Sequence, residues 1–510
     1  MLVTPDELNV DERLRVQLWD SDRFTTDDDL GRIELDLKHL MTGDETNGKM
    51  QDRTDGFRAL KAGEEMPGKL EWSVGYFSKV RIQPCQLEAQ TFDPEIRSFK
   101  QLEDRVDEDC RRKLREANIK EGRDPRDVSE LEQQKAQEMK TRQDAMIISA
   151  PPPEGYPSGI FSITVHQITG LSLEPVNKAH GEKNSDDYEE AEQGEGLPSA
   201  YCTVIINHNK VFKTRTKPAN SKPFYNAGIE RFIPDWTNAE VHVSVRDARV
   251  KEEDPLIGIV HLPLHEVFKE RSQINGYYPL MGGVGFGRVR ISMVWRSVQL
   301  QASPKDLGWS YGTLEVKSGI TAINVPEDLQ HHKLRFHTDL GYGKQYSGKH
   351  DEVGHWHSRK NRSLKLPVKR RYGSCLAIEF RNSGSFRDST SAFCTFWLRQ
   401  LVDEEEQEVT LPIYKGNYKR ACATSAEQPG EQYGELKLKL TFWSGLGGAH
   451  DKWTSKDKNL RDVIEVLECT KDNEERHQEA KEAGIEDDSA SDDDESEDSD
   501  QEEQSDNEDD

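Results

Sequence analysis

The sequence predicts a mainly β protein of tandem antiparallel sandwiches, with a charged α-helical linker and a disordered acidic tail. Three stretches contain short segments in which apolar and polar residues alternate, which is the period of a strand with one buried face. Apolar residues make up only 34% of the 510 residues and charged residues 32%, so part of the chain lies outside any core. The net charge is −26, but the last 25 residues hold sixteen acidic side chains and no basic one. The first 485 residues therefore carry −10.

Residues 1–80 form the first strand-rich unit. Apolar and polar residues alternate over 14–18, 31–37 and 69–77. From residue 93 the sequence becomes charged and Gln-rich, with apolar residues every four positions at Leu102, Val106, Cys110 and Leu114. This narrow apolar stripe predicts solvated helices of coiled-coil type over the linker 93–149, which three consecutive prolines then end.

Two longer units follow the linker. In residues 156–298 the pattern predicts strands at 159–165, 200–206, 210–217, 240–247, 256–262 and 288–295. In residues 309–447 it predicts strands at 312–317, 374–381, 393–398 and 434–443. Many short strands joined by turn-rich loops favour antiparallel sandwiches. Residues 471–510 are acidic, rich in Ser and nearly free of large apolar residues, so we expect them to be disordered.

An acidic loop at residues 19–31 is the most informative motif. Asp20 and Asp22 lie two residues apart at the end of a predicted strand, and Asp28 follows after a short turn. Carboxylates gathered on one hairpin loop repel one another unless a divalent cation neutralises them. Ca²⁺ suits such a loop, because it accepts six to eight oxygen ligands in flexible geometry. A solvated acidic loop is the alternative explanation.

The loop resembles the third top loop of a C2 domain, in which a third Asp follows D-x-D after six positions and a Gly follows three later. Asp20, Asp22, Asp28 and Gly31 have this spacing. The resemblance implies Ca²⁺ as the ligand of the three aspartates. Such sites draw further aspartates from an earlier loop, and only nineteen residues precede Asp20. We therefore expect a truncated sandwich with a half-site.

The tip of the same loop carries Arg23 and Phe24. In C2 domains that bind Ca²⁺, basic and aromatic residues at this position enter the headgroup region of a membrane. The resemblance therefore implies that Phe24 adds apolar burial in the interface and that Arg23 meets anionic headgroups.

Residues 156–298 resemble a C2 domain over their full length, but their loops differ from the calcium-binding pattern. Ser199 stands where the family has an Asp. The third loop runs from Asp247 to Gly258, and in it Arg249 replaces the second ligand and Pro255 the third. Because a cation at Arg249 opposes a bound Ca²⁺, we expect this domain to bind no calcium.

Basic residues of the two longer units predict a negatively charged membrane as the partner. Alternation over 210–217 places Lys213, Arg215 and Lys217 on one strand face. The densest basic cluster of the chain lies in the third unit and comprises Arg359, Lys360, Arg362, Lys365, Lys369, Arg370 and Arg371. Each basic residue near an anionic leaflet contributes about 1 kcal/mol, so we expect both sets to bind anionic phospholipids. A solvated strand face, or docking of the acidic tail, would use the same residues.

The acidic tail supports a second function, a scaffold that captures basic proteins. Three serines of the tail, Ser491, Ser499 and Ser505, have an acidic residue three positions later, as at the sites of acidophilic kinases. Phosphorylation there would add negative charge.

Charge and motifs also exclude classes of function. Nucleic-acid binding requires a basic surface, and the first 485 residues are net acidic, so we expect no nucleic-acid binding. No nucleophile elbow is found and no set of Ser, His and Asp residues lies in a recognisable catalytic motif, so we expect no enzyme. The order of the units resembles the C-terminal part of fungal multi-C2 tethers, a group similar to tricalbins, extended synaptotagmins and the meiotically up-regulated C2 proteins. The resemblance implies a peripheral protein of the cytoplasmic membrane face, for example at contacts between endoplasmic reticulum and plasma membrane.

Overall fold

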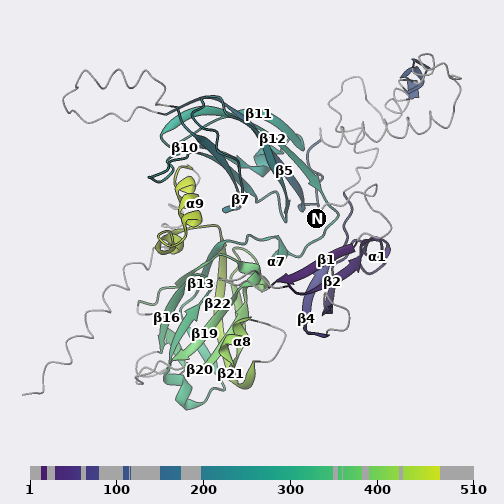
Figure 1. Cartoon of the computed structure of the whole chain (residues 1–510). Coiled ribbons are helices and arrows are strands. Elements are labelled where there is room, and N and C mark those ends of the chain that lie inside the picture. Colours follow the sequence, from purple (N-terminus) through teal and green to yellow (C-terminus); the bar gives the residue numbers. More distant parts are fainter. Residues whose placement is uncertain are drawn as a thin grey trace, which may run out of the picture. The chain divides into compact units, whose positions relative to one another are not determined.

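The structure, a computed structural model, describes residues 13–19, 29–58, 65–79, 107–108, 110–113, 115–116, 150–173, 197–347, 354–358, 360–381, 390–423 and 429–470. The chain divides into two compact units, Met1–Ile160 with Arg296–Gln301 and Phe161–Trp295 with Ala302–Asp510. Nearly all the strands pair antiparallel, and β structure dominates (Figure 1). The predicted fold class is therefore confirmed.

The first unit contains one four-stranded sheet in the order β1-β2-β3-β4. Its elements are β1 (Arg13–Trp19), β2 (Asp29–Asp36), α1 (Leu37–Thr42), β3 (Gln51–Arg58) and β4 (Glu65–Val74). In α1, Leu37 and Leu40 pack with Val74 in a small core. β1 and β2 pair from Arg13 with Asp36 to Trp19 with Asp29, so the acidic loop connects two paired strands. In the linker, residues 107, 108, 110–113, 115 and 116 are helical, and the remainder of its predicted helices lies outside the described residues.

The second sandwich packs the sheet β10-β9-β6-β7 against the sheet β11-β12-β5-β8. Its elements are β5 (Gly159–Leu173), β6 (Ala200–Ile206), β7 (Asn209–Lys213), β8 (Phe224–Ile233), β9 (Glu240–Asp247), β10 (Leu256–Pro263), α6 (Leu264–Val267), β11 (Gln273–Pro279) and β12 (Gly285–Ser297). Alternate residues such as Val241 and Val243 point into the core between the sheets, with Phe161 and Trp295. All six predicted strands are present. However, β7 ends at Lys213, four residues before the predicted end.

The third sandwich is built from one ten-stranded sheet in the order β14-β17-β16-β15-β19-β20-β21-β22-β13-β18. β14 also pairs with β22, so eight of these strands form a closed circuit around the core of Phe336, Trp356, Phe380 and Phe442. The strands are β13 (Gly312–Val316), β14 (Ile320–Ile323), β15 (Lys333–His337), β16 (Tyr342–Ser347), β17 (His355–His357), β18 (Leu364–Val368), β19 (Cys375–Arg381), β20 (Thr390–Trp397), β21 (Gln407–Gly416) and β22 (Gly430–Ser444). The helices are α7 (Pro304–Leu307), α8 (Tyr418–Ala423) and the 3-10 turns η2 (Glu327–His331), η3 (Arg371–Gly373), η4 (Leu398–Gln400) and η5 (Gly448–Trp453).

A C-terminal helix, α9 (Lys458–Glu468), follows the third sandwich (yellow in Figure 1). The Asp457 carboxylate caps it by accepting hydrogen bonds from the backbone N–H groups of Asn459 and Leu460. Its buried residues Leu460, Val463, Val466 and Leu467 recur at helical spacing and contact the outer face of the β6 and β10 sheet. Within the described residues, no helix has both the length and the apolar character that a membrane crossing requires.

Candidate membrane-binding surfaces

The third loop of the second sandwich, residues 248–255, is organised around an arginine. The Arg249 Nε lies 3.3 Å from the Asp247 Oδ2, and its Nη1 lies 2.7 Å from the Glu252 Oε2. The other Asp247 oxygen accepts a hydrogen bond from the Ser199 backbone N–H at 2.7 Å. The guanidinium group therefore supplies the positive charge for the carboxylates of this loop.

Asp254, the remaining possible calcium ligand of this loop, also accepts hydrogen bonds from groups of the protein. Its Oδ1 accepts from the Arg249 backbone N–H at 2.9 Å, and its Oδ2 accepts from the Tyr201 hydroxyl at 2.8 Å. Burial alone would raise the pKa of Asp254, but these hydrogen bonds hold it below its usual range. A Ca²⁺ ion needs free carboxylate oxygens and no neighbouring cation, so these residues do not fit calcium.

The basic segment 213–223 lies at the same end of the sandwich as this loop. The Lys217 backbone N–H donates to the Ala200 carbonyl, and the Asn220 N–H donates to the Pro198 carbonyl. From the other side, the Ala248 N–H donates to the Ser199 carbonyl. Both loops thus hydrogen-bond to the segment 198–200, which lies between them.

The exposed side chains at this end include basic and apolar groups, together with Glu252 and Glu253. A third loop joins them, because the Val284 N–H donates to the carbonyl of Leu256, the first residue after loop 248–255. Phe224 and Val250 expose most of their side chains, although apolar groups usually avoid water. The loop-end surface is the following set, in which Lys217 is half-buried and the others are exposed: Arg215, Lys217, Lys222, Phe224, Val250, Val284 and Phe286.

Lys213 differs from the other predicted lipid-binding residues of this segment. Its Nζ lies 3.6 Å from the centroid of the Tyr201 ring. Partial burial lowers the pKa of Lys213, although the nearby Asp254 carboxylate opposes the change. The predicted strand face is interrupted after Lys213, because β7 ends there. Thr214 points inward, as the alternation predicts, and its hydroxyl accepts a hydrogen bond from the Cys202 N–H. Of the three predicted residues, Lys213 and Arg215 are exposed and Lys217 is half-buried.

Helix α9 covers the part of the sheet beside β7. Neither this helix nor its position was among the elements predicted from the sequence. The Lys210 Nζ lies 2.7 Å from the Asp462 Oδ2. The buried Arg246 donates from Nη2 to the Asp462 carbonyl at 3.0 Å and to the Glu465 Oε2 at 2.7 Å. This face of the sandwich is therefore occupied by the chain itself. The helix-capping Asp457, with apolar residues at helical spacing after it, is the signal that could have predicted α9.

The densest basic cluster of the sequence does not form one surface. Arg371 is fully buried, and its guanidinium donates to the Asp403 carboxylate and to the Leu401 carbonyl. Its Cζ also lies 4.5 Å from the centroid of the Phe442 ring. The prediction that Arg371 binds lipid is wrong for this structure, because the side chain is an internal part of the third sandwich.

Lys369 is likewise engaged within the protein. Its Nζ lies 2.5 Å from the Asp457 Oδ2, and this hydrogen bond raises the pKa of Lys369. Lys365 is half-buried on β18, where it pairs in register with Glu315. Lys360, Arg362 and Arg370 are exposed, and Arg359 lies outside the described residues.

Two further predicted sites lie outside the described residues. One is the acidic loop of the first unit, with Asp20, Asp22, Arg23, Phe24 and Asp28. The other is the tail, with its three candidate phosphorylation sites Ser491, Ser499 and Ser505. Of the first loop, the structure describes the strands that flank it, and these pair as a hairpin.

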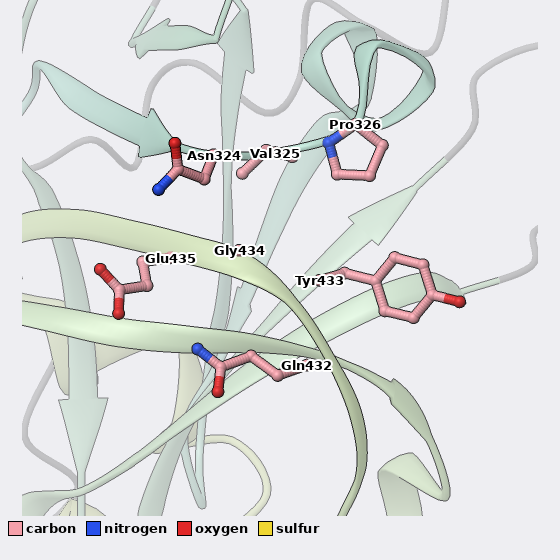
Figure 2. A pocket seen from close by; sticks show the side chains of 7 residues that line it. All are labelled: Asn324, Val325, Pro326, Gln432, Tyr433, Gly434 and Glu435. Carbon is pink, nitrogen blue, oxygen red and sulfur yellow. The ribbon is translucent and has the colours of Figure 1, made fainter.

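The third sandwich also has an open depression of about 690 Å³ (Figure 2). It lies between the segment Asn324–Pro326 and the β22 residues Gln432–Glu435. Gly434 has a φ of +124°, and a Cβ atom there would lie 2.6 Å from the Asn324 carbonyl oxygen. The seven lining residues include a carboxylate and two amides but no Lys or Arg, so the depression does not suit an anionic headgroup.

Comparison with protein families gives two matches. The family described as the third C2 domain of meiotically up-regulated Mug190 protein matches residues 308–447. The C2 domain family matches residues 2–51 and 159–280. The first of these C2 matches spans the acidic loop, and the second spans the loop-end surface up to its 281–286 segment.

Similar proteins are found among curated sequences and solved structures. The meiotically up-regulated gene 190 protein of Schizosaccharomyces pombe is 29% identical over 495 residues, which cover 92% of this chain and 38% of that protein. A structure of extended synaptotagmin 2 that contains its SMP domain and two C2 domains is 15% identical, covers 60% of this chain and 59% of its own, and has a TM-score of 0.26. Human GIVD cytosolic phospholipase A2 is 14% identical, covers 60% of this chain and 36% of its own, and has a TM-score of 0.23. Residues 2–51, 159–280 and 308–447 thus match C2 families, and the antiparallel sheets of the structure have the architecture of tandem C2 domains.

Proposed function

We propose that this protein is a non-enzymatic, peripheral membrane protein that docks on anionic phospholipids through the loop-end surface of its second C2 domain. One observation carries the proposal. The hydrogen bonds to segment 198–200 bring a basic loop and an exposed apolar loop tip to the same end of the sandwich. Cations and protruding apolar side chains together are the combination that an anionic bilayer interface attracts.

Acidic residues beside the loop-end surface are already neutralised. Glu252 pairs with Arg249 at 2.7 Å, and Glu253 pairs with the Arg461 Nη2 at 2.9 Å. The nearby cations are thus available to headgroups without competition from these two carboxylates. At about 1 kcal/mol for each basic residue, Arg215, Lys217 and Lys222 together contribute about 3 kcal/mol, a factor on the order of a hundred in affinity.

Vesicle co-sedimentation with the full chain tests the proposal. Changing Arg215, Lys217 and Lys222 to Glu should abolish binding to phosphatidylserine vesicles, and wild-type binding should weaken as salt rises. A matched control changes three exposed residues at the opposite end of the sandwich to Glu. These are Arg231, near the end of β8, and Lys269 and Arg271, which follow β10 and α6. Equal loss in both triple variants would show general electrostatics, and equal retention would refute the proposal.

A second pair of variants tests the apolar contribution. Phe224 and Phe232 are both exposed on β8, near its two ends. Inserting a Phe side chain into the interface stabilises binding by about 1.5–3 kcal/mol, so Phe224→Ala should weaken binding at least tenfold, whereas Phe232→Ala should not. Capture of basic proteins by the acidic tail, with no vesicle binding, would favour the scaffold function instead.

We further propose that the first domain adds a calcium-dependent contact through Asp20, Asp22 and Asp28, with Arg23 and Phe24 at the loop tip. The C2 family match to residues 2–51 supports this proposal. The chain spans 38% of its Schizosaccharomyces relative, so a role as part of a tether at contacts between endoplasmic reticulum and plasma membrane is a proposal for the longer protein. As expected for a half-site, calorimetry should detect weak Ca²⁺ binding that Asp20→Asn with Asp22→Asn removes, and an unchanged titration would refute the calcium-dependent contact.

A further inference from the structure

A cluster of two imidazoles and one carboxylate lies on the outer face of the second C2 domain, away from the loop-end surface. Glu240 and His242 alternate on β9, so both side chains leave the same face of the sheet. Their neighbours Val241 and Val243 point into the sandwich core. His261 on β10 lies directly opposite His242 in the antiparallel register. The ligand atoms of Glu240, His242 and His261 all lie within 4.8 Å of one another.

We propose that Glu240, His242 and His261 form a zinc site. Two ligands at positions i and i+2 of one strand, with a third directly across the ladder, converge on one point above the sheet. Two imidazole nitrogens and a carboxylate oxygen are a donor set that Zn²⁺ prefers, with a fourth position for water. Zinc bonds of about 2.1 Å bring tetrahedral ligand atoms to about 3.4 Å apart, so the three side chains must close by at most about 1.4 Å.

The geometry of the rings shows what that closure requires. The His242 and His261 rings are stacked, with centroids 4.5 Å apart and an interplanar angle of 16°. A shared ion requires the two rings to tilt, so that a nitrogen of each points to the same place. Rotation about the Cβ–Cγ bonds provides this tilt without moving the strands, because terminal torsions of this kind are soft.

A third histidine, His208, lies close to the carboxylate. The His208 Nδ1 accepts a hydrogen bond from the Leu446 backbone N–H at 2.8 Å. In a neutral imidazole the proton is then on Nε2, which lies 3.7 Å from the Glu240 Oε2. A small movement would let this N–H donate to the carboxylate, as groups beside a metal ligand commonly do.

The surroundings shield the three ligands from most of the solvent and leave the fourth position open to water. Glu240 and His242 are buried, and His261 is half-buried and leaves a path for entry. The Glu240 backbone is fixed, because its N–H donates to the Asn207 Oδ1 and its carbonyl accepts from the Asn207 N–H. His208 also packs edge-on against Trp309 of the third sandwich at 4.9 Å between ring centroids. Zinc here would stabilise β9, β10 and their junction with the third sandwich. This inference is independent of the proposed membrane function.

Cobalt titration of the chelator-treated full chain tests the site, because tetrahedral Co²⁺ absorbs strongly in the visible range and Zn²⁺ displaces it. The wild type should bind one Co²⁺ with tetrahedral intensity, and Zn²⁺ should raise its melting temperature. His261→Gln and Glu240→Gln should each lose the band and the thermal shift. His208→Gln should weaken binding about tenfold to a hundredfold.

The control variant is His265→Gln, since that side chain is exposed on α6 and outside the cluster. It should keep both signals. Carboxylates of the acidic tail also bind Co²⁺, but octahedral Co²⁺ with oxygen ligands absorbs only weakly. Its spectrum therefore differs from that of tetrahedral Co²⁺ in the proposed site. Absence of the tetrahedral band from the wild type, or an undiminished band in both His261→Gln and Glu240→Gln, would overturn the proposal. The wild-type measurement decides even where a variant fails to fold.

Discussion

Two adjacent arginines of the third sandwich, Arg370 and Arg371, should behave in opposite ways when each is changed to Ala. Arg371 is fully buried and forms an ion pair with the Asp403 carboxylate, whereas the Arg370 side chain is exposed. Removing one partner of a buried ion pair costs about 3–5 kcal/mol, because the other charge is left without compensation. The Asp403 side chain retains 21% exposure and the hydrogen bond from the Trp309 N–H, so we expect the lower end, about 3 kcal/mol.

The assay is urea unfolding of both variants, with vesicle binding measured in parallel. Arg370→Ala retains the backbone hydrogen bond that Asp339 accepts, and its free energy of unfolding should stay within about 0.5 kcal/mol of wild type. If the third sandwich docks on anionic lipid, Arg370→Ala should weaken binding about fivefold, the equivalent of about 1 kcal/mol. A stable Arg371→Ala protein with reduced vesicle binding would refute this reasoning, since it would mean that the Arg371 side chain reaches the surface.

Four further predictions concern single side chains. Leu460→Ala should destabilise the packing of α9 by about 2–5 kcal/mol and speed amide exchange in α9, whereas the exposed Glu468→Ala should not; equal exchange in both would contradict the packing. Arg249→Asp should gain a calcium-dependent rise in melting temperature that Arg249→Ala lacks, because it removes the internal cation and adds a ligand. Burial lowers the pKa of His450 to about 4, so protonation opposes folding: stability should fall by up to about 3 kcal/mol from pH 7 to pH 4, and His450→Gln should lack this part of the slope in urea titrations. Gly434→Ala should cost about 1–3 kcal/mol in thermal unfolding, since its positive φ and the Asn324 carbonyl both disfavour a Cβ.

Strands that bury one face were predictable from alternation alone. β6 and β9 begin and end where the pattern predicts, because every second residue of each faces the sandwich core. β3 and β8 escaped prediction for different reasons. The β3 sequence QDRTDGFR has one large apolar residue. In β8, FYNAGIERFI, the residues 226–228 interrupt the apolar pattern, although Ile233, Tyr225 and Ile229 pack on the core. Pairing in the ladder, which sequence patterns do not record, supplies the missing stabilisation.

The candidate site was predictable only in part, because exposure of a cation depends on its tertiary partners. Arg215 and Lys217 are placed at the loop end by hydrogen bonds to segment 198–200, which local sequence does not reveal. Lys369 follows Val368 in a basic run, yet its charge is satisfied by Asp457, 88 residues further along the chain. The density of basic residues in the sequence therefore predicted a lipid-binding surface, whereas in the structure Lys369 and Arg371 of this cluster form ion pairs within the protein.

Many basic residues of this acidic protein form ion pairs with its own carboxylates. Arg246 and Lys210 hold the carboxylates of α9, and Arg249 holds those of the third loop. Lys210 and Arg246 attach α9 to the sheet and Arg249 closes its own loop, so a membrane could recruit any of them only by breaking a contact. The cations of the loop-end surface lie instead beside protruding apolar side chains. Membrane attraction at that end and self-attachment along the α9 face are thus separable, and the charge-reversal variants at 215, 217 and 222 should weaken vesicle binding while leaving α9 protected from exchange.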